Sequence, residues 1–398
     1  MITRVQVKNF RSLVDVDVEL GPLTVLVGRN GAGKSTFLDV LRFVRDALRL
    51  GLDTAISQRG GIGAIRRWSA QGKPYDIQIR VNVSTPNIWG EYSFIIGSER
   101  QEDYKVKREV CSASVSQITG DDGKPLPETF EVQGGEWKTP PSGFFAYMNG
   151  VNGRPLPTVS VSQLVLPTMA TVSPVMSQLQ GLLLRTSFFA IFPNLLREPQ
   201  KPTSEKALLD NAENLAVALQ RLKNSLRFRE LVSVLDRVTD GIENVRVRQV
   251  GGYLVTELKH NAKNGHSPWF ELAQASDGTI RVLGLLAALY QDVPRTLLAI
   301  EEPELAIHPG ALALLSDVVQ EAATRNQVIT TTQSPDLISR FKAEQLRIVE
   351  RIDGQTYIGP IDEVQRETIN DQLFSAGDLL RIEGLHRKLP EETAASHA

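Results

Sequence analysis

The stretch that decides the fold is a glycine-rich loop, Gly28-Arg29-Asn30-Gly31-Ala32-Gly33-Lys34-Ser35-Thr36. It fits the Walker A spacing Gly-x-x-x-x-Gly-Lys-Ser, in which main-chain N–H groups turn inward onto phosphate oxygens at the start of a helix. An apolar run before the loop predicts a buried strand over residues 23–27. Apolar residues at helical spacing follow it, namely Phe37, Leu41, Val44 and Leu48. We therefore predict a strand, a phosphate loop and an amphipathic helix over residues 34–50.

The loop also predicts the cofactors. Lys34 is placed to neutralise the β- and γ-phosphates of ATP, and Ser35 is placed to ligate Mg²⁺. An ordinary glycine turn that opens a helix is the alternative, and the strand and helix on either side favour the phosphate loop. The predicted nucleotide contacts are Asn30, Gly31, Ala32, Gly33, Lys34, Ser35 and Thr36.

Two carboxylates follow a second predicted strand. The run Thr296 to Ile300 is short and apolar, and it ends in Glu301 and Glu302. Ligands of parallel α/β sheets bind at this edge. Glu301 is expected to hold Mg²⁺ through water, and Glu302 to orient or deprotonate the attacking water. A solvated acidic turn is the alternative, which the phosphate loop disfavours, so the sequence predicts an ATPase.

Composition sets the broad class. The chain has 398 residues, 41% hydrophobic and 23% charged, which is typical of a soluble globular protein of two or three domains. The net charge of −2 argues against a wholly basic nucleic-acid binder but leaves DNA binding through a local patch open. The single cysteine, Cys111, excludes an internal disulfide framework and is expected to be a buried thiol. No signal peptide and no apolar run long enough for a bilayer is evident, so we expect a cytoplasmic protein without membrane contact.

The remaining patterns predict the organisation of the chain. Alternation over residues 75–115 predicts an antiparallel sheet, and residues 120–175 are interpreted as a loop-rich insertion. Further expected elements are helices at 176–192 and 204–239, a hairpin at 245–258, an α/β stretch at 270–350, and short helices at 363–389 before frayed final residues. Residues 260–266 are interpreted as a solvated hairpin loop, not a metal site.

Four segments are predicted from these patterns. They are an N-terminal ATPase lobe over 1–118, the loop-rich insertion over 119–200, a C-terminal ATPase lobe over 201–360, and a short helical tail over 361–398.

Four ordered motifs resemble the ABC-type ATPase heads of RecF, SMC proteins and the overcoming-lysogenization-defect (OLD) nucleases. Besides the Walker A loop they are the opening Val5 to Ser12, the Ser-Asp-Gly-Thr segment within Ala275 to Arg281, and Ile300 to His308, which resembles Walker B and the D-loop. The likeness covers most of residues 1–100 and 205–350. It implies an α/β P-loop fold with a mixed sheet core, an antiparallel β lobe and a helical lobe.

The resemblance also implies a homodimer. In that family the signature segment of one subunit contacts the γ-phosphate held by the Walker A loop of another, so two heads enclose two nucleotides. Ser276 and Gly278 are the corresponding residues here, offering a hydroxyl and a close backbone approach. On its own this segment would be read as a helix cap. Association beyond the dimer stays open.

Two residues depart from the family pattern. Gln333 stands where the family usually has a histidine after the last core strand. Glutamine can hydrogen-bond a γ-phosphate or water but cannot act as an imidazole acid or base, which implies slow hydrolysis. Glu301 stands where many members have aspartate, and its longer reach suits water-mediated Mg²⁺ binding. Gln58 is either the Q-loop metal ligand or a plain surface glutamine.

The function is predicted by analogy with the family. OLD-type nucleases carry a Toprim nuclease domain after the ATPase, and the chain ends at residue 398, too soon after Gln333 for such a domain. The leading hypothesis is a stand-alone OLD-like ATPase of bacterial anti-phage defence or DNA processing. Its ATP-driven dimer would regulate a separately encoded effector, such as a Toprim-like nuclease. The alternatives are a RecF-like DNA clamp in repair and a free-standing NTPase sensor.

Overall fold

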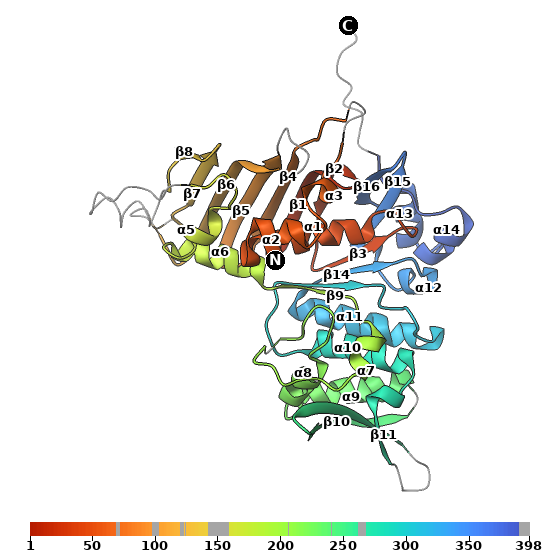
Figure 1. Ribbon diagram of the computed structural model, residues 1–398. Coiled ribbons are helices and arrows are strands. Elements are labelled where there is room, and N and C mark those ends of the chain that lie inside the picture. Colours follow the sequence, from red (N-terminus) through yellow and green to blue (C-terminus); the bar gives the residue numbers. More distant parts are fainter. Residues whose placement is uncertain are drawn as a thin grey trace. The chain divides into compact units, whose positions relative to one another are not determined.

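The structure is a computed structural model that describes residues 1–68, 72–97, 103–119, 123, 125–141, 159–205, 207–239, 241–261 and 268–389. The chain forms two compact units (Figure 1). The first unit comprises Met1–Leu184 and Phe341–Ala398, and the second unit comprises Arg185–Arg340.

The first unit is built on a mixed sheet. Its strands are β1 (Ile2–Phe10), β2 (Leu13–Glu19), β3 (Leu23–Val27), β4 (Ile77–Ser84), β5 (Ile88–Gly97), β6 (Lys105–Val115), β7 (Glu128–Gln133), β8 (Glu136–Thr139), β15 (Leu346–Ile352) and β16 (Gln355–Pro360). They lie in the order β8-β7-β6-β5-β4-β1-β2-β16-β15-β3. The pairs from β8 to β2 are antiparallel, whereas β16 pairs with β2 and β15 with β3 in parallel. Distant parts of the chain therefore meet beside the strand that precedes the phosphate loop.

The helices of the first unit include the one that follows the phosphate loop. They are α1 (Lys34–Leu50), α2 (Leu52–Ser57), α3 (Ile62–Ile65), α5 (Leu166–Met169), α6 (Pro174–Leu184), α13 (Glu363–Asn370) and α14 (Ala376–Ile382). The predicted apolar face of α1 is buried, with Phe37 and Leu41 no more than 3% exposed. The predicted strand over residues 23–27, the helix over 34–50 and the antiparallel sheet over 75–115 are confirmed.

The prediction of a loop-rich stretch over residues 120–175 is wrong in part: β7, β8 and α5 form within it, while residues 159–165 and 170–173 are turns and irregular structure. Strand β7 extends the antiparallel sheet, with Phe130 and Val132 buried on one of its faces. Helix α6 packs on the sheet so closely that a Cβ at Gly90 would lie 2.7 Å from Leu179. Cross-strand pairing and this packing supply the order that the Gly- and Pro-rich composition hides. Residues 142–158 lie outside the described part of the chain.

The second unit combines a parallel sheet with helices and a small antiparallel sheet. Strands β14 (Gln327–Thr332), β13 (Leu297–Glu301) and β9 (Thr186–Phe189) are parallel neighbours in that order. The antiparallel sheet contains β10 (Ile242–Val250), β11 (Tyr253–His260) and β12 (Trp269–Glu271). The helices are α7 (Pro193–Arg197), α8 (Leu215–Leu222), α9 (Leu226–Thr239), α10 (Asp277–Tyr290), α11 (Leu312–Arg325) and α12 (Pro335–Ile338). The predicted hairpin over 245–258 and the α/β stretch over 270–350 are confirmed.

Two helix predictions are wrong in part. The helix expected over 176–192 ends at Leu184, because residues 186–189 pair in parallel with β13 as strand β9. The helix expected from 204 begins only at Leu215. The buried Asn214 side chain holds the segment before it, accepting from Leu209 N at 2.8 Å and donating to Ala207 O at 2.7 Å. Tertiary pairing and a side-chain hydrogen bond thus override helical propensity.

Other expectations concern the ends and loops of the chain. Short helices α13 and α14 occur within residues 363–389, as predicted, and Cys111 is buried. Residues 262–267, with most of the predicted 260–266 loop, and residues 390–398 lie outside the described part. Strands β15 and β16, expected in the C-terminal lobe, pair within the first unit, and the four-segment division stays a prediction. None of the helices in the described part is long and apolar enough to cross a membrane.

A fully buried carboxylate fastens helix α5 to strand β6. Glu109 accepts hydrogen bonds from Val165 N at 2.6 Å, Leu166 N at 2.9 Å and the Tyr92 hydroxyl at 2.9 Å. Burial raises the pKa of Glu109 to about 7, although the three donors favour the charged form. The folded state therefore binds a proton more tightly at this site than an unfolded chain with the ordinary value.

We expect this carboxyl to make stability depend on pH. Because its folded pKa lies above the unfolded value of 4.5, its contribution is fully present below pH 4.5 and is lost as pH rises through about 7. Urea unfolding of the wild type and of Glu109→Gln measures the free energy of unfolding of each. The wild-type value minus the variant value should decrease from pH 5 to pH 8. Glu136→Gln, at an exposed position, is the control. A difference between wild type and Glu109→Gln that is constant with pH would contradict this expectation.

Candidate nucleotide site

The phosphate loop of the first unit has the backbone conformation that turns peptide groups toward an anion. Gly31 has φ 75° and Gly33 has φ 115°, values that L side chains rarely adopt. Gly33 is the residue before α1, and among the described residues no side chain caps the start of this helix. The N-terminal N–H groups of an uncapped helix carry partial positive charge. The loop therefore fits a phosphate group.

The side chains of the loop differ in exposure. Lys34 is buried, and its Nζ lies 2.7 Å from the carbonyl oxygen of Gly28 and 3.2 Å from that of Arg29. Asn30 and Ser35 are exposed, and Thr36 is half-buried. The ammonium group is thus held at the inner rim of the loop by main-chain oxygens, from which it can also donate to phosphate oxygens.

Two residues that sequence reasoning missed shape the loop from the other end of the chain. A Cβ at Gly33 would lie 2.4 Å from the Thr356 hydroxyl, and a Cβ at Gly28 would lie 2.3 Å from the carbonyl oxygen of Val349. The Thr356 hydroxyl lies 2.8 Å from both the Ala32 carbonyl oxygen and the Ser12 hydroxyl. No local pattern could reveal Thr356, because it follows the loop by more than three hundred residues and meets it only through β16.

A cavity of about 820 Å³ borders the outer part of the loop. It is lined by residues 27–32 of the loop, residues 348–352 at the end of β15, and Leu380, Gly384 and Leu385. Arg351 donates to the Gly31 carbonyl oxygen at 3.1 Å. The cavity shows that the loop is accessible within the first unit.

In the second unit the predicted acids lie at the end of β13. Glu301 is the last residue of the strand, and Glu302 and Glu304 follow it in the turn. Glu302 has φ 44°, a left-handed conformation that is uncommon for a residue with a side chain. Its N–H is held by Thr331 of β14, through the carbonyl oxygen and Oγ1, each at 3.1 Å. A strained backbone at a candidate catalytic residue is typical of functional sites.

The residues at the end of β14, Thr332 to Ser334, form the switch segment, and they are hydrogen-bonded to the same turn. The Thr332 hydroxyl donates to Oε1 of Glu304 at 2.5 Å, and the Gln333 N–H points to the same oxygen at 3.4 Å. The Gln333 side chain is exposed. Burial raises the pKa of Glu304, the Thr332 bond acts against the rise, and the negative Glu302 adds to it. Sequence reasoning missed Glu304, although it belongs to the acidic motif.

The signature segment packs against the other side of this turn. Ser276 caps α10, because its hydroxyl oxygen accepts a hydrogen bond from Thr279 N at 3.2 Å. The segment therefore acts as a helix cap, the alternative that the sequence also allowed. A Cβ at Gly278 would lie 2.6 Å from the carbonyl oxygen of Ala306, so only glycine fits. Burial lowers the pKa of Arg281, while Glu302 and Glu304 act to raise it. The second unit therefore brings signature, acids and switch together.

Gln58 is exposed at the end of α2, in the first unit. Its neighbour Arg59 is anchored to α1 by ion pairs with Asp39 at 2.9 Å and Asp46 at 3.0 Å, and Asp39 also pairs with Arg11. Its role as a metal ligand stays a prediction. Ser35 lies in the first unit and Glu301 in the second, and within the described residues no group of three or more His, Cys, Asp or Glu side chains could hold a metal ion.

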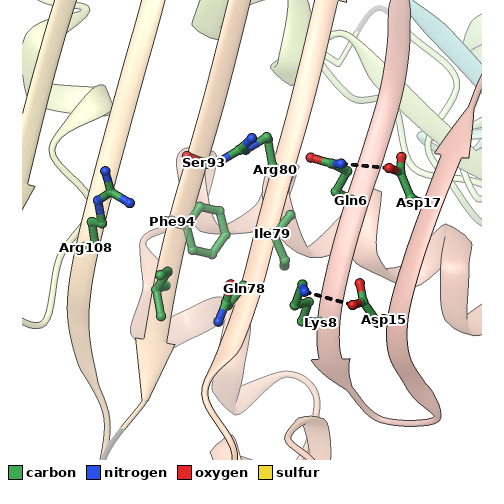
Figure 2. A pocket seen from close by; sticks show the side chains of 11 residues that line it. Gln6, Lys8, Asp15, Asp17, Gln78, Ile79, Arg80, Ser93, Phe94 and Arg108 are labelled. Carbon is green, nitrogen blue, oxygen red and sulfur yellow. Dashed lines mark hydrogen bonds and ion pairs between the residues drawn. The ribbon is translucent and has the colours of Figure 1, made fainter. Parts of the chain in front are cut away.

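A second hollow, of about 280 Å³, lies on the face of the antiparallel sheet (Figure 2). Figure 2 shows Lys8 bonded to Asp15 and Gln6 bonded to Asp17 across β1 and β2. The other basic residues of the lining are also paired, Arg80 with Glu91 at 3.5 Å and Arg108 with Glu131 at 2.8 Å. Because acids neutralise these bases, the hollow is not a positive patch for a phosphate backbone.

Comparisons with known proteins agree with the fold. A family model described as "AAA domain, putative AbiEii toxin, Type IV TA system" matches residues 172–339, and one described as "AAA ATPase domain" matches residues 1–73. The OLD nuclease of Thermus scotoductus is 59% identical over 44 residues, which are 11% of this chain and 8% of that protein. The chain thus aligns with less than a tenth of that relative's length.

A solved structure of an SMC head is similar in fold. An SMC head bound to the C-winged helix domain of ScpA has 15% identity and a TM-score of 0.50, with 92% of this chain and 99% of that chain covered. The head with an extended coiled coil from Pyrococcus furiosus, bound to the C-terminal domain of ScpA, has 13% identity and a TM-score of 0.47, with 94% and 99% covered. The predicted α/β P-loop fold is confirmed, and the matches together support an ABC-type ATPase of the OLD and SMC kind.

Proposed function

We propose that the protein binds and hydrolyses ATP with Mg²⁺, dimerises on ATP, and thereby regulates a partner effector in bacterial anti-phage defence or DNA processing. The observation that carries the ATPase part is the phosphate loop. Its Gly31 and Gly33 adopt positive φ, and no side chain of the described residues caps the start of α1. An anion is favoured there by main-chain N–H groups and by the helix dipole. Lys34 neutralises phosphate charge, and Ser35 offers a hydroxyl to the metal.

The turn after β13 supplies the hydrolytic groups in this proposal. Glu301 binds Mg²⁺ through water, and Gln58 completes the metal ligands. Glu302 accepts a proton from the attacking water or orients it, which needs the fixed position that Thr331 gives its backbone. Gln333 donates a hydrogen bond to the γ-phosphate or to that water, and it cannot carry a proton as histidine does. We therefore expect slow turnover.

The dimer follows from the signature segment. Ser276 and Gly278 contact the nucleotide held by the phosphate loop of the second copy, so that each site is complete only in a C2 pair. Ser276 is exposed at the start of α10, where its hydroxyl and the helix dipole can face an anion. ATP then favours the closed dimer over the open state because it binds the closed state more tightly.

The effector is proposed from the relatives. The curated relative is a nuclease, and the stretch shared with it is a small part of that protein. One solved SMC head is bound to a domain of another protein, ScpA, which is a precedent for an ATPase head with a partner. We propose that a Toprim-like nuclease is the effector here. The paired charges of the sheet hollow give no support to the alternative of a DNA clamp.

Two substitutions test the ATPase proposal directly. Lys34→Ala should weaken ATP binding by about 100-fold or more, since a buried cation at the phosphate is lost. Lys138→Ala, which removes an exposed lysine of the same unit, should bind as the wild type does. Isothermal titration calorimetry with ATP and Mg²⁺ measures both. Wild-type protein that takes up no ATP would sink the proposal.

Glu302→Gln should still bind ATP and accumulate as a dimer. The amide keeps the shape of the side chain but cannot accept the proton of the attacking water. ATP is therefore not hydrolysed, and the closed dimer does not open. Sedimentation velocity with and without ATP and Mg²⁺ measures the shift. A variant that stays monomeric with saturating ATP would count against the dimer, and adding duplex DNA to the same sample tests the clamp.

Two glycines of the loop form a matched pair. Gly33→Ala should abolish ATP binding, because φ 115° is strained for alanine and its Cβ would meet Thr356. Gly31→Ala should cost only about 1 kcal/mol of strain, because among the described residues no heavy atom beyond its two chain neighbours lies within 4 Å of its Cβ position. Calorimetric ATP affinity and urea unfolding distinguish the two variants. Equal losses in both would show that the contact with Thr356 does not shape the loop.

A further inference from the structure

The turn after β13 and the turn after β14 are cross-linked through one carboxylate. Oε1 of Glu304 accepts from the Thr332 hydroxyl at 2.5 Å and faces the Gln333 N–H at 3.4 Å. Glu304 has no place in the mechanism above, and the family motifs in the sequence did not single it out. It nevertheless contacts the residue before the switch glutamine and the switch glutamine itself.

The hydrogen bonds continue from Thr332 along the switch. The Thr332 hydroxyl accepts from Ser334 N at 3.0 Å, and Ser334 Oγ in turn accepts from Leu337 N at 3.4 Å at the start of α12. Gln333 thus lies between two residues whose positions are fixed by side-chain hydrogen bonds. Its own side chain stays exposed and able to reach a ligand.

The second oxygen of Glu304 makes this arrangement unusual. Oε2 is buried, and it has no hydrogen-bond partner among the described residues. A buried carboxylate oxygen without a partner is unfavourable, so a residue that served packing alone would be better replaced by an apolar side chain. Two charged groups interact with this carboxylate. The negative Glu302, on the same turn, acts to raise the pKa of Glu304, and Glu304 in turn acts to raise the pKa of Arg281 on α10. The unfavourable carboxylate is therefore placed where its other oxygen can hydrogen-bond Thr332 and Gln333.

We propose that Glu304 is a positioning residue that clamps Thr332 and Gln333 to the turn of Glu302, so that Gln333 and Glu302 act on the same nucleotide. This rests on the proposed ATPase function. Glu304 acts through Gln333 and does not itself touch the nucleotide. The two turns follow the neighbouring parallel strands β13 and β14. Strand pairing alone does not fix the distance between Glu302 and Gln333, and the clamp does.

Amide hydrogen exchange tests the clamp without nucleotide. In the full chain, Glu304→Ala and Thr332→Val should each speed exchange of the Gln333 and Ser334 amides about tenfold or more, since each loses a hydrogen bond that orders them. Thr332→Ser keeps the hydroxyl and Glu304→Gln keeps an accepting oxygen, so both should exchange close to the wild type. Exchange over β13 reports whether a variant merely unfolds. Unchanged exchange in Glu304→Ala would overturn the clamp.

Steady-state kinetics test its consequence. Glu304→Ala and Thr332→Val should lower kcat about tenfold with KM within about twofold, and the double variant should be no slower than either, as for two residues that act through one interaction. Additive losses, or a rise in KM that accounts for the effect, would overturn the positioning role. So would a normal kcat in variants whose exchange has risen. If the wild type does not hydrolyse ATP, the proposed function fails, while the exchange result still decides the clamp.

Discussion

The contact between Gly33 and Thr356 is the constraint on which the phosphate loop depends. The start of α1 offers N–H groups to an anion only because Gly33 takes φ 115°, and the Thr356 side chain fills the space that a Cβ would need. The same hydroxyl lies within hydrogen-bonding distance of Ala32 and Ser12. One threonine therefore fixes the loop against β16 and the end of β1, and the loop cannot relax into a simple helix cap.

In the second unit, strained backbone conformations fix the position of the acidic turn. Glu302 sits at φ 44° and Ala306 at φ 63°, and both belong to the turn that follows β13. Hydrogen bonds that the Glu302 N–H donates to Thr331 hold the first, while the close approach of Gly278 to the Ala306 carbonyl packs the signature helix against the second. Such backbone conformations persist only where neighbours over-determine them. The acids, the signature and the switch consequently form one connected body.

The sequence predicted the parts whose signal is local. Helical spacing of apolar residues gave α1, strict alternation gave β4 to β6, and the loop pattern gave the phosphate site. It missed β9, because residues 186–189 become a strand only through pairing with β13, more than a hundred residues away. It missed β7 since Gly- and Pro-rich neighbours mask its alternation. Among site residues it placed Glu301, Glu302 and Gln333 at adjacent strand ends but overlooked Glu304.

The sequence by itself determined which residues can bind phosphate and which can act as acids, because glycine spacing, side-chain chemistry and periodicity act over a few residues. Only the tertiary structure decided that Thr356 and Val349 shape the loop and that Glu304 joins Thr332 to the acidic turn. These contacts join segments far apart in the chain, or side chains whose direction depends on a turn. Their formation depends on which distant strands pair and how side chains pack in the folded chain, and a pattern of a few residues does not contain that information.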